Sequence, residues 1–246
     1  MAGSFDERRD AILDAHPHWV PLMLHEVLDR AAEATPDRPY ILTDAQSFTY
    51  EDVAQRSRKL AGGLAQLGIA RGDHVAVLLA NHPEFVWIKY AISRLGAVAV
   101  PVNFLNRRDE LAYVLAQSDA KLLITMERFK DLDYLAMLDG IAPEWEQGGG
   151  GETLPRLKRV VVTDGTRPGA MALPDLDGPP PVDVAGDASL ISDIIYTSGT
   201  TGQPKGVQMS HDMLTRAAFT SALTRGFGDG WRVLFSLPMY HVYGYV

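Results

Sequence analysis

The chain lacks cysteine among its 246 residues. Disulfide bonds, thiolate metal sites and a cysteine nucleophile are therefore excluded. It also lacks any apolar run near the ~18 residues that a membrane-spanning helix needs. Its first ten residues include Asp6, Glu7, Arg8, Arg9 and Asp10, a charged composition that is unlike a secretory signal peptide. Together these absences predict a soluble, cytoplasmic protein with no transmembrane segment.

Positive charge is also scarce, since 23 lysines and arginines stand against 31 aspartates and glutamates, for a net charge of −8. This balance argues against a nucleic-acid-binding surface. It does not argue against ATP, because a local loop can bind an anion within an acidic protein. The remaining composition, 46% hydrophobic and 22% charged, is ordinary for a globular chain and argues against disorder.

Short apolar runs of strand length alternate along the chain with segments that carry apolar residues at helical spacing. We expect strands over residues 75–80, 98–102, 122–125, 159–163, 191–197, 207–210 and 233–237. We expect helices over residues 22–32, 50–67, 82–95, 109–117, 131–138 and 212–223. This alternation predicts an α/β fold with layered, parallel-rich sheets, helices on both faces and right-handed crossovers.

Polar residues mark where some of these helices begin. Thr49, with Asp52 three residues later, predicts a capping box, and Asn81 with Glu84 predicts a second one. Asn106 is expected to cap the helix over 109–117. Between the elements, the glycine-rich residues 147–151 predict a flexible insertion, and residues 169–187 predict a long surface loop.

The most informative segment is residues 196–207, Tyr-Thr-Ser-Gly-Thr-Thr-Gly-Gln-Pro-Lys-Gly-Val. Its glycines allow backbone N–H groups to approach an anion closely, its hydroxyls donate neutral hydrogen bonds, and its lysine adds a mobile charge. It is neither a Walker-type phosphate loop nor a Gly-x-Gly-x-x-Gly turn. Candidate phosphate-binding residues are Thr197, Ser198, Gly199, Thr200, Thr201, Gly202 and Lys205.

This segment lies between two predicted strands, so it cannot use a helix N-terminus directly. Its own N–H groups and hydroxyls must therefore hold the anion. The alternative is a glycine- and threonine-rich hairpin loop that binds no ligand, in which Lys205 is an ordinary solvated lysine.

The segment resembles the signature of the adenylate-forming superfamily, which includes acyl-CoA synthetases, aryl-CoA ligases and the adenylation domains of peptide synthetases. Residues 237–244, Leu-Pro-Met-Tyr-His-Val-Tyr-Gly, resemble the Pro-x-aromatic-His-x-x-Gly stretch of the CoA ligases. Residues 47–53 and 96–103 resemble two earlier segments of the same family, in the expected order. The resemblance implies that residues 1–246 are the N-terminal portion of the large AMP-binding domain, without the small C-terminal domain.

The resemblance implies a two-step reaction, in which a carboxylate attacks the α-phosphate of Mg·ATP and the thiol of coenzyme A then attacks the acyl-adenylate. It implies that residues 197–202 and Lys205 hold the β- and γ-phosphates and that Thr197 contacts Mg²⁺. It also implies catalytic roles for Lys205 and for His241 beside the acyl pocket. The alternative for His241 is a buried histidine at the end of a strand.

The function implied is an ATP-dependent carboxylic acid–CoA ligase, and the overall resemblance favours a fatty acid. The partners implied are a small carboxylic acid, ATP and coenzyme A, with room for loose membrane contact through an acyl substrate. The 246 residues alone are expected to be inactive, because the later family segments, including the catalytic lysine, are missing. Two alternatives remain: a truncated, non-enzymatic product, or another adenylate-forming enzyme such as an aryl-acid ligase or a peptide-synthetase adenylation domain. Oligomeric state is not indicated.

Overall fold

A computed structural model describes residues 4–16, 18–165, 167–181, 186–197 and 203–245. Its main element is a seven-stranded sheet. The strands of this sheet are β3 (His74–Leu78), β4 (Val98–Pro101), β5 (Leu122–Thr125), β8 (Arg159–Val162), β9 (Ala170–Ala172), β10 (Ile191–Thr197) and β11 (Lys205–Ser210). Their spatial order is β11-β10-β4-β3-β5-β8-β9, and all neighbours run parallel except β10 and β11.

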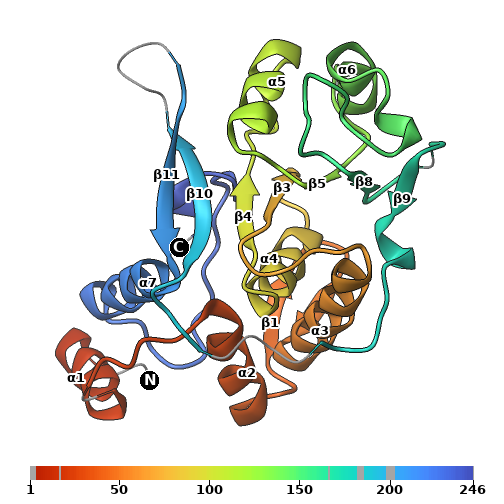
Figure 1. Ribbon diagram of the computed structural model, residues 1–246. Helices are drawn as coiled ribbons and strands as arrows, with labels where there is room; N and C mark the ends of the chain where they lie inside the picture. Colours follow the sequence, from red (N-terminus) through yellow and green to blue (C-terminus); the bar gives the residue numbers. More distant parts are fainter. Residues whose placement is uncertain (1–3, 17, 166, 182–185, 198–202, 246) are drawn as a thin grey trace.

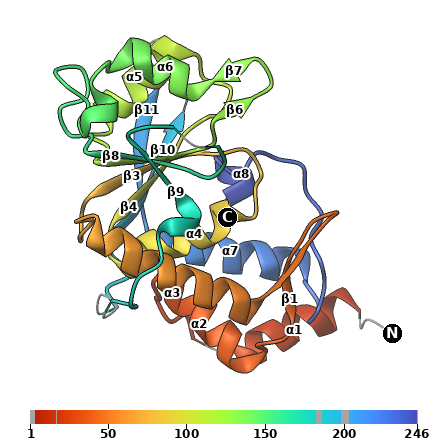
Figure 2. The same ribbon diagram turned by 90° about the vertical axis from the view of Figure 1, so that its right-hand side faces the viewer.

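Helices cover both faces of the sheet, as predicted. They are α1 (Phe5–Ala15), α2 (Leu24–Ala34), α3 (Tyr50–Gln66), α4 (Glu84–Arg94), α5 (Arg108–Gln117), α6 (Tyr134–Ile141), α7 (His211–Arg225) and the short α8 (Val242–Tyr245). Figure 2 shows α5 and α6 on one face and α2, α3, α4 and α7 on the other. The remaining elements are β1 (Pro39–Leu42), β2 (Ser47–Thr49), β6 (Arg128–Phe129), β7 (Leu132–Asp133) and the 3₁₀ turns η1 (Trp145–Gln147) and η2 (Leu173–Asp175).

The central strands are buried on both sides, which explains their continuous apolar sequences. Every residue of β4 and β5 is buried. Helices α3 and α4 supply the lower half of this core in Figure 2, with residues such as Leu64 and Ile88 that are fully buried. The predicted strand segments over 122–125 and 191–197 match β5 and β10 residue for residue.

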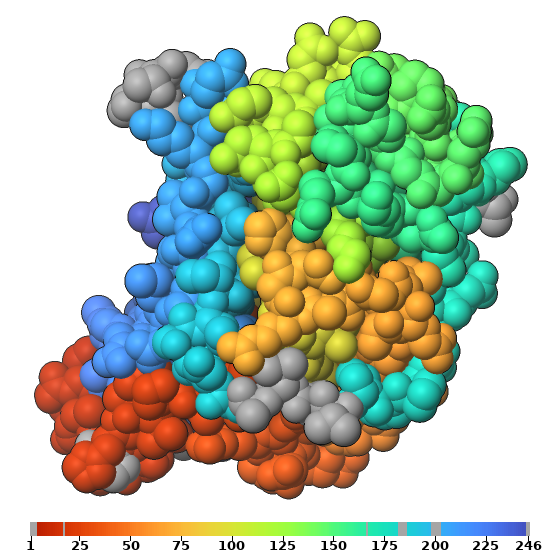
Figure 3. Space-filling view, viewed as in Figure 1, coloured from red at the N-terminus to blue at the C-terminus, as the bar shows by residue number. Residues whose placement is uncertain are grey.

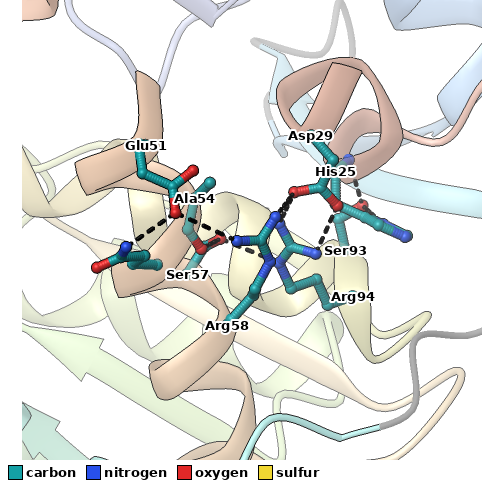
Figure 4. A network of polar contacts seen from close by, with 9 residues as sticks. His25, Asp29, Glu51, Ala54, Ser57, Arg58, Ser93 and Arg94 are labelled. Carbon is teal, nitrogen blue, oxygen red and sulfur yellow. Dashed lines mark hydrogen bonds and ion pairs between the residues drawn. The ribbon is translucent and has the colours of Figure 1, made fainter. Parts of the chain in front are cut away.

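A polar network joins α2, α3 and α4 within this helical layer (Figure 4). Arg94 of α4 is fully buried and donates to both carboxylate oxygens of Asp29 at 2.6 and 2.8 Å and to Ser57 Oγ at 3.0 Å. Arg58, at the outer side of the network, donates to the same carboxylate at 2.7 Å. Charged hydrogen bonds therefore join the three helices at this point.

The N-terminal residues lie beneath α7, in red below blue in Figures 1 and 3. Helix α1 is an addition to the predicted elements and is capped by Ser4, whose Oγ accepts from Glu7 N. Arg8 Nε donates to the Gly226 carbonyl at 2.6 Å, and Trp19 Nε1 donates to Asp212 Oδ1 at 2.7 Å. These contacts fasten both ends of α7 to the N-terminal segment.

One predicted capping box is confirmed and two caps are wrong. Thr49 N donates to Asp52 Oδ2 at 2.8 Å, and Asp52 N donates to Thr49 Oγ1 at 3.1 Å. Asn81 caps nothing, because the backbone of Pro83 is already helical and α4 begins directly after it without a side-chain cap. Helix α5 begins after Arg107, so Asn106 does not cap it either.

Three predicted segments need correction. The loop over 169–187 contains β9 and η2, because its residues 170–172 form a short parallel edge strand beside β8. Residues 147–151 begin with the last residue of η1 and include a bridge between Gly150 and Leu154, and a Cβ on Gly150 would lie 2.2 Å from the Leu154 carbonyl oxygen. Residues 233–237 form no strand: no described backbone pairs with them, and Leu234 is 100% exposed.

Candidate functional site

The candidate site lies at the carboxyl edge of the central strands. Strands β3, β4 and β10 run parallel, so their C-terminal ends meet at one edge of the sheet. The chain leaves β3 for α4 on one face and leaves β4 for α5 on the other face (Figure 2). In open α/β sheets, such diverging connections form the crevice in which ligands bind.

The glycine-rich segment begins at this edge. Thr197 is the last residue of β10 and pairs across the antiparallel ladder with Lys205, the first residue of β11. Both side chains are exposed. The strand–loop–strand prediction is therefore right in its two strands, although β11 begins two residues before the predicted Val207. The candidate residues Ser198, Gly199, Thr200, Thr201 and Gly202 lie outside the described residues.

Close packing explains the glycine after Lys205. Gly206 pairs with Tyr196 in the ladder. A Cβ on Gly206 would lie 2.7 Å from Ile194 Cγ2 and 3.3 Å from the Tyr196 ring. A larger residue would therefore push β11 away from β10, and the pairing of Thr197 with Lys205 depends on that contact.

Helix α5 braces both strands of this hairpin through two tyrosine hydrogen bonds that no local sequence pattern indicated. Tyr113 Oη donates to the Pro204 carbonyl at 3.0 Å, on the side of the returning strand. One turn further along α5, Gln117 Oε1 accepts from Tyr196 Oη on the outgoing strand. Burial raises the pKa of Tyr196 to about 12, so its hydroxyl is protonated and able to donate at neutral pH. The two hydrogen bonds hold both ends of the glycine-rich segment against one helix.

The segment over 237–244 lies at the same edge. Asn81, just after β3, donates from Nδ2 to the Leu237 carbonyl and accepts at Oδ1 from Met239 N, each at 2.9 Å. His241 N then donates to the Pro238 carbonyl at 3.0 Å. A Cβ on Gly244 would lie 2.4 Å from that carbonyl oxygen, which explains the glycine at this position. The imidazole of His241 is exposed, so the alternative of a histidine buried at a strand end is wrong.

Aromatic side chains support this segment from the ends of β4 and β5. The ring of Phe104 contacts Tyr240 edge-on at 5.4 Å and Phe129 at 4.8 Å between centroids. The Phe104 carbonyl accepts from Tyr134 Oη, whose pKa burial raises to about 12. Tyr243 is 77% exposed and stacks on the His241 ring at 5.7 Å. Tyr240 thus packs against an aromatic cluster at this edge.

The structure brings some of the predicted site residues together. Thr197 and Lys205 are paired, but no hydrogen bond joins either of them to His241. Within the described part of the chain, no three histidine, cysteine, aspartate or glutamate residues form a group that could hold a metal ion. The exposed hydroxyl of Thr197 could supply one ligand to Mg²⁺, which in proteins commonly keeps several waters and binds substrate phosphates.

A mainly parallel sheet with helices on both faces, and a hydroxyl- and glycine-rich segment between two strands at its carboxyl edge, define an α/β protein. The particular class follows from comparison with known proteins: residues 28–246 match the model of the AMP-binding enzyme family. The chain belongs to this family.

Several relatives resemble the chain over most of its length. The 2-succinylbenzoate–CoA ligase of Oceanobacillus iheyensis is 34% identical over 230 residues, which cover 93% of this chain and 41% of that protein. A long-chain-fatty-acid–CoA ligase (FadD1) from Archaeoglobus fulgidus superposes with a TM-score of 0.76 at 25% identity, covering 93% of this chain and 45% of that one. The o-succinylbenzoate–CoA synthetase (MenE) of Bacillus subtilis, solved in complex with ATP and magnesium ion, superposes with a TM-score of 0.69 at 25% identity, covering 89% and 52%.

The chain thus spans about two fifths of the length of the Oceanobacillus iheyensis ligase, of which it covers 41%. The relatives include ligases of an aromatic acid and of long-chain fatty acids. None of the described helices is both long enough and apolar enough to cross a membrane.

Proposed function

We propose that the protein carrying this chain is an ATP-dependent carboxylic acid–CoA ligase that forms an acyl-adenylate. The observation that carries the proposal is the pairing of Thr197 with Lys205 at the carboxyl edge of the sheet, the edge at which Asn81 also contacts the segment that bears His241. Membership of the AMP-binding enzyme family supports it. As part of the same proposal, residues 1–246 are the N-terminal portion of the large domain, and the protein is cytoplasmic.

The glycine-rich hairpin holds the β- and γ-phosphates of ATP in this proposal. The residues assigned to that role are Thr197, Ser198, Gly199, Thr200, Thr201, Gly202 and Lys205. The Lys205 ammonium and the hydroxyls stabilise negative charge that develops on the leaving pyrophosphate, which lowers the barrier of the first step. Mg²⁺ neutralises phosphate charge when bound, and the Thr197 hydroxyl is its proposed protein ligand.

His241 is assigned to the acyl side of the site. Its exposed imidazole lies on the turn that Pro238 closes, so it can donate or accept a hydrogen bond toward the carboxylate. Tyr240 and Phe104 supply an aromatic wall next to it. The acid proposed is a fatty acid. The second candidate is an aromatic acid, because the relative that is 34% identical is a 2-succinylbenzoate–CoA ligase.

Carboxylate-dependent exchange of pyrophosphate into ATP tests the proposal, with a panel of fatty and aromatic acids. We expect exchange from the protein carrying this chain and none from residues 1–246 alone. In the complete ligation assay with coenzyme A, Lys205→Ala should raise the KM for ATP or lower kcat by about tenfold or more, with little change in the KM for coenzyme A. Lys158→Ala, an exposed lysine beyond the site, is the matched control.

If no acid supports exchange, the proposed ligase activity would be overturned. An equal effect of Lys205→Ala on ATP and coenzyme A would overturn the phosphate role. The acid that supports the highest kcat/KM decides between the fatty and the aromatic substrate.

A further inference from the structure

The side chain of Asn81 acts on the backbone of a segment 156 positions away in the sequence. Its amide donates to the Leu237 carbonyl and accepts from Met239 N, both at 2.9 Å. One donor and one acceptor that flank a single residue reproduce the pattern of a β-ladder, in which a neighbouring strand would supply both groups. The asparagine side chain thus holds residues 237–239 where no described strand does.

The position of Asn81 is itself fixed by the fold. It follows β3 at the carboxyl edge, after the buried Leu79 and Ala80, and it precedes Pro83, which opens α4. The amide is exposed and takes no part in capping α4. Its two hydrogen bonds therefore add nothing to the helix and act only on the distant segment.

The clamped residues lead directly into the turn that bears His241. Pro238, between the two clamped residues, accepts from His241 N at 3.0 Å. Met239 packs against the core, and Tyr240 contacts Phe104. Among the described residues, one polar and two apolar contacts therefore set the orientation of the turn, and of these three the Asn81 contact is the one with directional hydrogen bonds.

We propose that Asn81 is a positioning residue, which fixes the turn over 238–244 and thereby the imidazole of His241 at the carboxyl edge of the sheet. The clamp itself rests on geometry alone, whereas its effect on catalysis rests on the proposed function.

Hydrogen–deuterium exchange of the peptide that covers residues 237–244 tests the clamp in the protein carrying this chain. Asn81→Ala removes donor and acceptor, and we expect exchange about 5- to 10-fold faster than in the unchanged protein. Asn81→Asp keeps an acceptor for Met239 N but loses the donor to Leu237, so its exchange should be intermediate. His82→Ala, at the adjacent exposed position, is the control and should leave the exchange unchanged. Equal exchange in all four proteins would overturn the clamp.

Steady-state ATP–pyrophosphate exchange tests the consequence with the same variants. We expect Asn81→Ala to lower kcat about 10-fold with the KM for ATP within about twofold, because the phosphate hairpin is untouched. Asn81→Asp should recover part of kcat, and His82→Ala should match the unchanged protein. Faster deuterium exchange with an unchanged kcat would overturn the positioning role. Absence of catalysis in the unchanged protein would instead overturn the proposed ligase, and deuterium exchange would still decide the clamp.

Discussion

Lys89 of α4 and Asp193 of β10 form an ion pair inside the protein, with 2.9 Å between Nζ and Oδ1. The Asp193 side chain is fully buried, and that of Lys89 is 13% exposed. Asp193 also pairs with Ala99 in the parallel ladder and accepts from the Ser192 hydroxyl. The pair therefore joins the helical layer to the strand that leads to Thr197.

Asp193→Asn should destabilise the protein by about 3–5 kcal/mol, because it removes the negative charge that faces the largely buried Lys89 ammonium. Burial already lowers the pKa of Lys89 to about 8, in spite of the neighbouring carboxylate. Urea denaturation measures the loss. Asp177→Asn, which breaks the exposed pair with Lys59, is the control and should change stability by no more than about 1 kcal/mol. Equal losses in the two variants would contradict the buried role.

Arg94 and Arg58 offer a matched comparison, because both donate to Asp29 (Figure 4). Arg94→Met should cost about 3–5 kcal/mol, since it removes the hydrogen bonds that a fully buried side chain donates to Asp29 and Ser57. Arg58→Met should cost about 1 kcal/mol or less, because that side chain is 33% exposed. Thermal and urea unfolding of both variants give the two values, and a larger loss for Arg58→Met would refute the assignment.

The same network predicts an acid response. Burial alone would raise the pKa of Asp29, but the hydrogen bond and charge of Arg94, with the charge of Arg58, hold it below its usual value. A lowered carboxylate pKa stabilises the folded state above the pKa of the unfolded chain, and this stabilisation is lost as the pH falls. In Arg94→Met the pKa of Asp29 should rise, which nuclear magnetic resonance titration of the carboxyl group can follow.

His211 predicts a second pH dependence, of independent origin. It is fully buried, and burial lowers its pKa to about 4; Lys89 and His25 add to this shift, and Asp193 and Asp187 oppose it. Nδ1 accepts from Leu24 N at 3.2 Å, so the proton of the neutral ring resides on Nε2, which has no hydrogen-bond partner among the described residues.

Between pH 6.5 and about 4 the unfolded chain binds a proton at His211 that the folded chain does not, so stability falls as the pH falls through this range and levels off below it. From pH 7 to pH 5 the loss should be about 2 kcal/mol. Urea unfolding at both pH values should show this component in the unchanged protein and in the exposed control His18→Asn, but not in His211→Asn. The same pH dependence in all three proteins would exclude His211 as its source.

Gly206→Ala should destabilise the β10–β11 hairpin by about 1–3 kcal/mol, because the added methyl group would meet Ile194 and Tyr196. Gly149→Ala is the control, since a Cβ there would have its nearest neighbour, the Leu157 carbonyl oxygen, at 3.9 Å. That variant should lie within about 0.5 kcal/mol of the unchanged protein. Thermal unfolding followed by circular dichroism compares the two variants. An unchanged melting temperature of Gly206→Ala would show that the hairpin has room to adjust.

The central strands and several helices were predictable, because continuous apolar runs and local capping pairs such as Thr49–Asp52 carry the information within a few residues. Residues 233–237 show the limit of this approach. Their apolar sequence is compatible with a strand, but a strand also requires a neighbouring backbone, which sequence alone does not supply. Strand β9 shows the reverse case, since its short Ala-Met-Ala sequence forms a strand because β8 lies beside it.

The candidate site was predictable only where a motif named it. Thr197, Lys205 and His241 came from local patterns, whereas Tyr113 and Asn81 contribute through partners 91 and 156 positions away. An asparagine after a strand is compatible with a helix cap and with a backbone clamp, and local spacing favours the cap. Only the folded arrangement distinguishes them.

The contacts between α1 and α7 have a consequence for how the chain is made. Arg8 and Gly226 are separated by 218 positions, so Arg8 emerges from the ribosome long before Gly226 has been synthesised. Strand β4 likewise has one unpaired edge until Asp193 arrives beside Ala99. Contacts of such long range form late and slowly, and an open strand edge invites pairing with another chain. Nascent chains of this protein should therefore be most vulnerable to aggregation between the synthesis of β4 and that of β10.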